Sequence, residues 1–188
     1  MRRLDLVVGP NGAGKTTFVE QRLAPLLPGS VFVNADVIAK DRWPDSAEKH
    51  SYEAARVAST IRDALIAQGE SFIAETVFSH PSKLDLIVNA RRAGFVVVLH
   101  VILVPVKLSV ARVAERVVEG GHRVPEDKIR ERYERLWSLV AEAIDRTDHA
   151  TVYDNTAADV TRIVARFVDG EAVGEPTWPA WTPADLVQ

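Results

Sequence analysis

The segment GPNGAGKTT, residues 9–17, contains the residue types and spacing needed to bind phosphate. Gly9, Gly14, Lys15 and Thr16 satisfy the pattern G-x-x-x-x-G-K-[ST], placed between an apolar run and a segment expected to be helical. Glycines let backbone N–H groups converge on phosphate oxygens, the lysine reaches the terminal phosphates, and the threonine hydroxyl coordinates magnesium. The segment therefore predicts a site for a nucleoside triphosphate, with Thr16 as a metal ligand.

Polar side chains follow two other apolar runs. Asn34 and Asp36 close the run VFVNAD, and Glu75 and Thr76 close the run SFIAET. In a parallel sheet, ligands gather at the carboxyl ends of the strands, so we expect these residues beside the phosphate-binding loop. There, Asp36 could accept a proton from a hydroxyl in line with the leaving phosphate, although an aspartate at this place could also cap a helix. We predict that Asp36 is catalytic and that Asn34, Glu75 and Thr76 face the substrate.

Phosphoryl transfer also needs positive charge near the transferred group, and residues 107–135 contain many arginines. Two adjacent glycines separate two helical patterns there, which is typical of a lid that closes over a site. We predict that Arg123 and Arg132 act with Lys15 in catalysis and that Arg116 binds the nucleotide. The alternative is a solvated surface, because acidic residues are interleaved with the basic ones. The residues expected to bind the nucleotide are Gly9, Pro10, Asn11, Gly12, Ala13, Gly14, Lys15, Thr16, Thr17 and Arg116.

Short apolar runs alternate with longer amphipathic segments, as in a parallel sheet flanked by helices. This pattern and the phosphate-binding loop predict an α/β fold of the P-loop NTPase type. We expect five parallel strands in the order 2-3-1-4-5. The expected strands are 4–8, 31–34, 71–75, 95–104 and 151–155. The expected helices are 15–26, 46–68, 82–92, 107–119, 127–146 and 157–169, with Gly69, Gly94 and Gly170 at helix ends.

The amino-acid composition indicates the broad class of protein. The chain has 188 residues, of which 47% are hydrophobic and 26% charged, and this predicts one globular domain. Residues 1–170 would form it, followed by a tail of residues 171–188 that is rich in proline and tryptophan. The formal charge of -3 argues against non-specific nucleic-acid binding, and no cysteine is available for disulfides. The apolar runs are too short for a secretory signal or a membrane span, so we expect a cytoplasmic protein.

Four blocks occur in order within residues 3–156: GPNGAGKTTF, VNADVIA, SFIAETVFS and RVVEGGHRVPEDKIRERYERL. Together they resemble the zeta-toxin-like P-loop kinases, in particular the stand-alone bacterial zeta toxin domain proteins. The resemblance implies ATP and Mg²⁺ as cofactors, an adenylate-kinase-like fold with a helical lid, and Asp36 as the catalytic aspartate. It also implies UDP-N-acetylglucosamine as the phosphate acceptor and a small antitoxin protein as a partner.

Several functions remain open from the sequence. A small-molecule kinase could act on another hydroxyl acceptor, such as a different nucleotide sugar, an antibiotic or a nucleoside. A second possibility is a P-loop ATP hydrolase or switch protein, in which water attacks the terminal phosphate. A third is a 5'-hydroxyl nucleic-acid kinase, against which the acidic balance of the chain argues.

Overall fold

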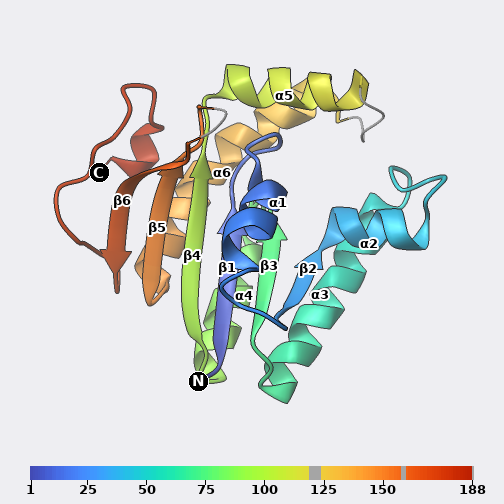
Figure 1. Ribbon diagram of the computed structural model, residues 1–188, viewed down its shortest axis with the longest axis horizontal. Helices are drawn as coiled ribbons and strands as arrows, with labels where there is room; N and C mark the ends of the chain where they lie inside the picture. Colours follow the sequence, from blue (N-terminus) through green and yellow to red (C-terminus); the bar gives the residue numbers. More distant parts are fainter. Residues whose placement is uncertain (119–123, 158–159, 188) are drawn as a thin grey trace.

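The computed structural model describes residues 1–118, 124–157 and 160–187. Within these residues, a seven-stranded sheet has the order β2-β3-β1-β4-β5-β6-β7 (Figure 1). The first five strands in this order pair in parallel, whereas β6 and β7 are antiparallel to their neighbours. The predicted parallel order 2-3-1-4-5 is confirmed. The strands are β1 Arg3–Val8, β2 Val31–Asn34, β3 Phe72–Thr76, β4 Val96–Leu103, β5 His149–Asp154, β6 Arg162–Val168 and β7 Glu171–Ala172.

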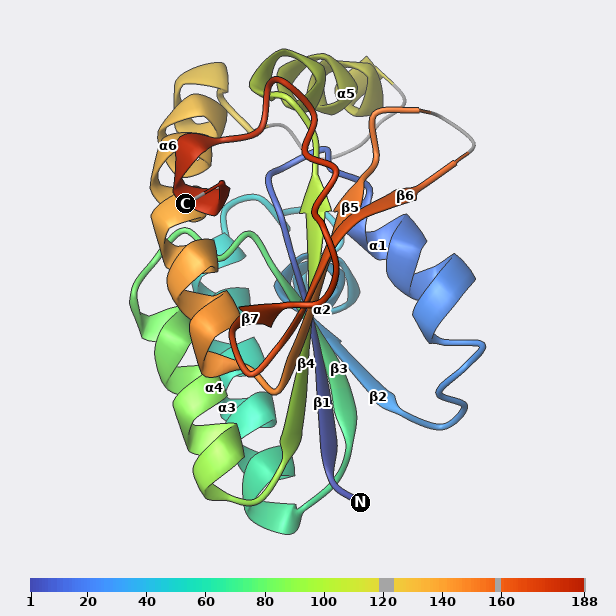
Figure 2. The ribbon, with the colours of Figure 1, turned by 90° about the vertical axis from the view of Figure 1, so that its left-hand side faces the viewer.

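Helices cover the two faces of the sheet unequally. Helices α3, α4 and α6 lie on one face, and α1 lies on the opposite face (Figure 2). Helix α5 runs across the carboxyl-terminal edge of the strands, above the loop that follows β1 (Figure 1). The helices are α1 Lys15–Phe18, α2 Ala35–Arg42, α3 Ser51–Gln68, α4 Ser82–Arg92, α5 Val106–Val118 and α6 Glu126–Arg146, with a π-helix η1 Val19–Leu23 and a 3₁₀ turn η2 Ala184–Leu186.

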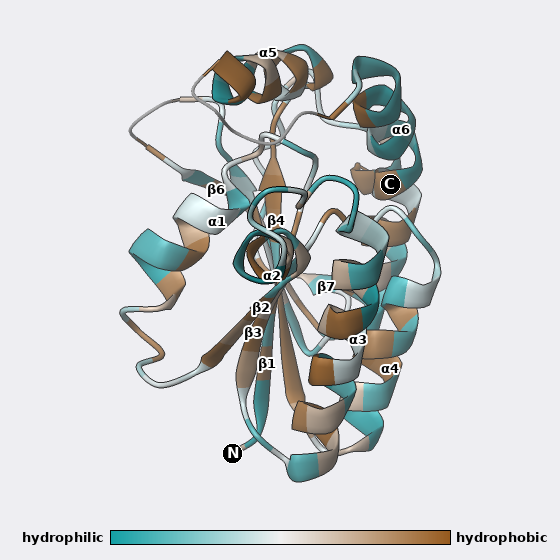
Figure 3. Ribbon diagram, turned by 90° about the vertical axis from the view of Figure 1, so that its right-hand side faces the viewer, coloured by the Kyte–Doolittle hydropathy of each residue, from teal (hydrophilic) through white to brown (hydrophobic). Residues whose placement is uncertain are grey.

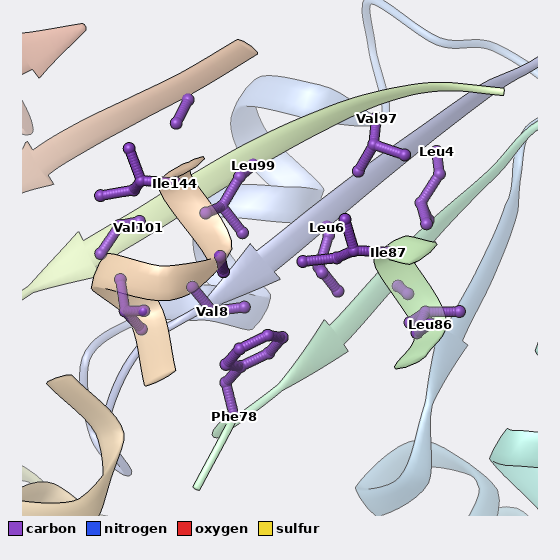
Figure 4. Close-up of a cluster of buried hydrophobic side chains, with 14 of the residues drawn as sticks. Leu4, Leu6, Val8, Phe78, Leu86, Ile87, Val97, Leu99, Val101 and Ile144 are labelled. Carbon is purple, nitrogen blue, oxygen red and sulfur yellow. The ribbon is translucent and has the colours of Figure 1, made fainter. Parts of the chain in front are cut away.

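The larger core lies between the sheet and the three-helix layer. Alternate residues of β1, Leu4, Leu6 and Val8, point into it and lie near Ile87 of α4 and Phe78, and all five are fully buried (Figure 4). Colouring by hydropathy shows mostly hydrophobic strands, while α3 and α4 mix hydrophilic and hydrophobic segments (Figure 3). The central strands are covered on both faces, which explains why they read as continuous apolar runs.

The predicted helix 157–169 is wrong, because Arg162–Val168 forms β6. This strand pairs antiparallel with β5, whose outer edge would otherwise lack hydrogen-bond partners. Val164 and Ala165 are buried against the core, and the segment contains several β-branched residues, which favour a strand. Gly170 consequently lies in the turn between β6 and β7, with φ 80°, and does not end a helix.

Two other expected helices differ in extent. The helix expected over 15–26 is α-helical only as far as Phe18, and then continues as a π-helix in which the Ala24 N–H donates to the Val19 carbonyl at 2.8 Å. The helix expected over 46–68 begins at Ser51. Helix α2, which the sequence analysis did not predict, begins directly after Asn34.

The C-terminal residues lie along the domain surface. Trp178 and Trp181 pack against the larger core, and the Thr177 N–H donates to the Val164 carbonyl at 2.8 Å. The boundary that we place at residue 170 stays a prediction, since β7 extends the sheet beyond it. Among the described helices, none combines the length and apolar character required to cross a membrane.

A polar cluster lies on the sheet face that carries α1. Asp5 is 1% exposed and accepts two hydrogen bonds of 2.7 Å from the guanidinium of Arg3. The Nε2 atom of His100 lies 2.9 Å from Asp5 Oδ1, which is also one of the two oxygens that accept from Arg3. Burial alone would raise the pKa of Asp5, but the hydrogen bonds from His100 and Arg3 outweigh it and hold that pKa below its ordinary value.

This cluster predicts a pH-dependent contribution to stability. Because the folded-state pKa of Asp5 is lowered, its carboxylate stabilises the fold above the ordinary aspartate pKa, and the contribution is lost as pH falls through the lowered value. Asp5→Asn should reduce the free energy of unfolding at pH 7 by about 1.5–3 kcal/mol, since hydrogen bonds to a charged group are lost. Urea unfolding at pH 7 and near pH 3 should show this difference shrinking at the lower pH. The exposed variant Asp45→Asn is the control, and a pH-independent deficit in Asp5→Asn would contradict the prediction.

Candidate active site

The loop between β1 and α1 is packed so closely that it requires glycine. Gly9 has φ 151°, and a Cβ atom there would lie 2.4 Å from the carbonyl oxygen of Ile102 on β4. Gly14 has φ 84°, and a Cβ atom there would lie 2.7 Å from Nδ2 of Asn155. At Gly9 both the backbone conformation and the space exclude a side chain, and at Gly14 the backbone conformation disfavours one and the Asn155 amide would have to move.

One distant side chain and one from the loop itself hold the loop's carbonyl groups. The Ser109 hydroxyl of α5 donates to the Asn11 carbonyl at 2.6 Å, and Lys15 Nζ donates to the Pro10 carbonyl at 3.0 Å. The Pro10 carbonyl also accepts from the Ala13 N–H at 3.2 Å. These hydrogen bonds hold the loop backbone in a fixed conformation, as a loop that binds an anion through N–H groups requires.

Asn155 makes a third contact of this kind, which the sequence analysis missed. Its Nδ2 donates to the Ala13 carbonyl at 2.7 Å, and its own Oδ1 accepts from the Thr161 hydroxyl at 3.0 Å. Arg112 of α5 donates to the backbone carbonyl of Asn155 at 2.9 Å. The sequence indicated only a polar residue at the end of a strand, and the contact spans 142 positions, so spacing alone could not reveal it.

The Glu75 carboxylate lies at the centre of the site. Its Oε2 accepts from the Thr16 hydroxyl at 2.9 Å and from Asn34 Nδ2 at 2.6 Å, and its Oε1 lies 3.9 Å from Lys15 Nζ. Lys15, Asn34 and Glu75 are all buried. The end of β3 is thereby joined to the loop and to the end of β2.

The electrostatic environment of Lys15 involves the other predicted residues. Burial lowers the pKa of Lys15, while the carboxylates of Glu75 and Asp36 raise it and Arg116 lowers it. Asp36 and Arg116 are both exposed, so their charges act on Lys15 from the solvent side of the site. The structure thus brings Asp36, Glu75 and Arg116 into electrostatic reach of the loop lysine.

Asp36 occupies the first turn of α2, whose N-cap is Asn34. The Asn34 Oδ1 accepts from the backbone N–H groups of Asp36 and Val37 at 2.7 and 3.3 Å. The capping role that the sequence left open for Asp36 is therefore taken by Asn34. The exposed Asp36 side chain remains available to a ligand.

The oxygen ligands suit a small hard cation. Mg²⁺ prefers oxygen and usually keeps water and substrate phosphates among its ligands, so a hydroxyl and a carboxylate such as those of Thr16 and Glu75 fit it. No cluster of three His, Cys, Asp or Glu side chains suited to a metal occurs in the described part of the chain.

Two further threonines were predicted to belong to the site. Thr17 is exposed, and the Thr76 hydroxyl accepts from the Phe78 N–H at 3.4 Å at the end of β3.

The arginines near the predicted lid differ in their burial and in their ion-pair partners. Arg132 is half-buried on α6 and makes no hydrogen bond or ion pair to another residue in the described ranges. Arg130 instead pairs with Glu126, and Arg135 with Glu131, on the solvated side of the helix. Arg123 lies outside the described residues, together with the glycines that precede it.

A comparison with protein families supplies the identity that the geometry points to. The model of the Zeta toxin family matches residues 2–166, which is most of the chain. This chain belongs to the zeta toxin family. The zeta toxin match includes the phosphate-binding loop, Asp36, Glu75 and both helices that carry the predicted arginines. The resemblance read from the sequence blocks is confirmed.

Solved structures with low sequence identity share the fold. A chain of the AvrRxo1-ORF1:-ORF2 complex with ATP gives a TM-score of 0.73 at 20% identity, covering 92% of this chain and 60% of its own length. A chain of the PezAT chromosomal toxin-antitoxin system of Streptococcus pneumoniae gives 0.62 at 13% identity, covering 88% of this chain and 71% of its own length. Shikimate kinase from Acinetobacter baumannii, in complex with shikimate, gives 0.52 at 23% identity, covering 75% and 79%. The zeta toxin chain thus has a P-loop kinase fold and spans 60% of the first of these structures.

The contact between Asn155 and the loop gives a test of how the loop is held. Asn155→Ala removes the donor to the Ala13 carbonyl, and we expect the affinity for ATP to fall about fivefold to tenfold, as for the loss of one hydrogen bond. Isothermal titration calorimetry of the variant measures this. Gln21→Ala, which removes an exposed amide on η1, should bind as the parent does. Equal affinities of Asn155→Ala and the parent would contradict a positioning role for Asn155.

Proposed function

We propose that this zeta toxin family member transfers the γ-phosphate of ATP to a hydroxyl group of a small molecule. The observation that carries the proposal is the placement of Asp36, which is exposed in the first turn of α2 and acts electrostatically on Lys15. A carboxylate beside the terminal-phosphate lysine can accept the proton of an attacking hydroxyl.

In the proposed reaction, the acceptor oxygen forms a bond to the γ-phosphorus while the bond from that phosphorus to the bridging oxygen breaks. The proton of the acceptor hydroxyl passes to Asp36, and ADP leaves with the bridging oxygen. Lys15 and Arg116 neutralise charge on the phosphates, and Arg123 and Arg132 are proposed to contribute further positive charge. Asn34 and Thr76 lie at the strand ends where the acceptor would be oriented.

Thr16 and Glu75 would hold Mg²⁺ in this proposal, Thr16 directly and Glu75 directly or through bound water. When bound, the ion supplies positive charge to the β- and γ-phosphate oxygens. The contacts of Glu75 with Thr16, Asn34 and Lys15 hold its carboxylate beside the loop, where it and the Thr16 hydroxyl would hold the ion.

UDP-N-acetylglucosamine is the first acceptor to test, because the sequence resemblance to zeta toxins suggests it. We expect ³²P transfer from γ-labelled ATP with Mg²⁺ to label this sugar nucleotide, and Asp36→Asn to lower turnover by about 100- to 10,000-fold while ATP still binds. Asp41→Asn, an exposed aspartate on the same helix, is the matched control and should be fully active. A panel of other nucleotide sugars, nucleosides and hydroxyl-bearing antibiotics extends the assay.

The same assay separates the kinase from other reactions. Free phosphate that the parent and Asp36→Asn release at equal rates would reject the proposal in favour of an ATP hydrolase. Labelling of 5'-hydroxyl oligonucleotides, with no labelled small molecule, would assign a nucleic-acid kinase instead.

A small antitoxin protein is the proposed partner. PezAT is a toxin-antitoxin system, and we extend such a pairing to this chain. Expression of the chain without its partner should then arrest bacterial growth, because an active kinase would consume its acceptor. Asp36→Asn should restore growth, and Asp41→Asn should not. Normal growth with the parent, at expression levels verified by immunoblot, would contradict a toxic activity.

A further inference from the structure

A second polar site lies in the helical layer, away from the phosphate-binding loop. Helices α3 and α4 run side by side on the face of the sheet opposite α1 (Figures 2 and 3). Between them is a pocket of about 230 Å³ that exposed and buried polar side chains line. Those used below are Ser59, Arg62 and Asp63 of α3 and Ser82, Lys83 and Asp85 of α4.

Arg62 is the unusual member of this pocket. The residue is only 6% exposed, yet its guanidinium makes no hydrogen bond or ion pair with any residue that the structure describes. Burial lowers the pKa of Arg62, and the neighbouring Asp63 opposes this effect, although an arginine remains charged at neutral pH. A buried cation without a close counter-ion is unfavourable unless a ligand or water satisfies it.

Lys83 adds a second cation to the same pocket. It is half-buried at the start of α4, and its ammonium group makes no hydrogen bond or ion pair within the described ranges. Burial lowers the pKa of Lys83, and the charge of Arg62 lowers it further. The two cations are therefore close enough for their charges to repel each other.

The carboxylates that line the pocket do not neutralise the two cations. Asp63 and Asp85 are exposed, so water screens their charges, and neither forms an ion pair with Arg62 or Lys83 among the described residues. The Ser59 side chain adds a hydroxyl group that can donate a hydrogen bond, whereas the Ser82 hydroxyl already lies 2.8 Å from His80 Nδ1. The interior of the pocket thus offers donors and positive charge.

We propose that the pocket between α3 and α4 binds a phosphate-sized oxyanion through Arg62 and Lys83. A guanidinium presents paired N–H donors that match two oxygens of a phosphate, and an ammonium adds a third donor and a point charge. The volume exceeds that of inorganic phosphate, so the anion is either free phosphate or a phosphate group carried by a small molecule. The site does not depend on the kinase activity proposed above.

Thermal unfolding of the full chain tests the site, with Lys15→Ala as the parent so that phosphate binding at the loop is weakened. Inorganic phosphate at about ten times its dissociation constant should shift the folding equilibrium about elevenfold, which corresponds to a Tm increase of about 3–6 °C for a chain of this size. Potassium chloride at equal ionic strength gives the baseline. Glycerol 3-phosphate is the second ligand.

Arg62→Gln and Lys83→Gln, each made in this parent, should lose the phosphate-dependent increase in Tm. Arg56→Gln, an exposed arginine of α3 that does not line the pocket, is the matched control and should keep it. If Arg62→Gln does not fold, Lys83→Gln decides, because its side chain is half-buried and its removal leaves the core intact. A larger Tm increase with glycerol 3-phosphate assigns a phosphomonoester, and an equal or smaller one assigns free phosphate.

Two results would overturn the proposal. One is a parent whose Tm does not respond to either ligand beyond the chloride baseline. The other is a phosphate response that Lys83→Gln and Arg56→Gln share equally, which would place the bound anion elsewhere on the chain.

Discussion

The contacts of the Glu75 carboxylate are the interaction on which the candidate site depends. Lys15 and Glu75 are both buried, and each would be unfavourable there without the other. Glu75 also accepts from the amide nitrogen of Asn34, which fixes the amide so that its oxygen faces the N-terminus of α2. That cap starts the helix whose first turn carries Asp36. A single buried carboxylate therefore links the charge of the loop lysine to the position of the proposed base.

A second constraint acts on the loop backbone. Gly9 and Gly14 bring the chain so close to β4 and to the loop after β5 that the conformation cannot relax without moving other elements. The donors Ser109 and Asn155 hold loop carbonyls, and Arg112 holds the backbone of Asn155 in turn. The phosphate-binding geometry is thus maintained by β4, α5 and the loop after β5 together. Preorganised donors of this kind lose little entropy when an anion binds.

Local chemistry was readable from the sequence, whereas long-range pairing was not. The glycine-lysine pattern and the apolar runs depend on residues within a few positions, so the loop and helix α4 were predicted correctly. The parallel strand order was also predicted correctly, but as part of the expected P-loop fold and not from local residues. The prediction of a helix at β6 was wrong because the periodicity of this short segment is mixed. Its secondary structure depends instead on pairing with the edge of β5. Asn155 holds the phosphate-binding loop through a contact across 142 positions of the chain. Asn34 caps α2 only because of the orientation of its side-chain amide. The roles of Asp36, Arg123 and Arg132 in catalysis stay predictions.

Lys15 and Arg62 show two ways in which this chain buries a cation. The carboxylate of Glu75 lies 3.9 Å from Lys15, and the lysine also donates to a backbone carbonyl, so its charge is partly satisfied before any ligand arrives. Among the described residues, the charge that opposes the burial of Arg62 is that of the adjacent, exposed Asp63, and Arg62 and Lys83 repel each other. The difference matters because an anion gains the most binding free energy where the protein alone leaves a positive charge without a partner. We expect this larger gain at Arg62. An anion bound between Arg62 and Lys83 would offset the cost of burying the guanidinium and would also reduce the repulsion between the two cations.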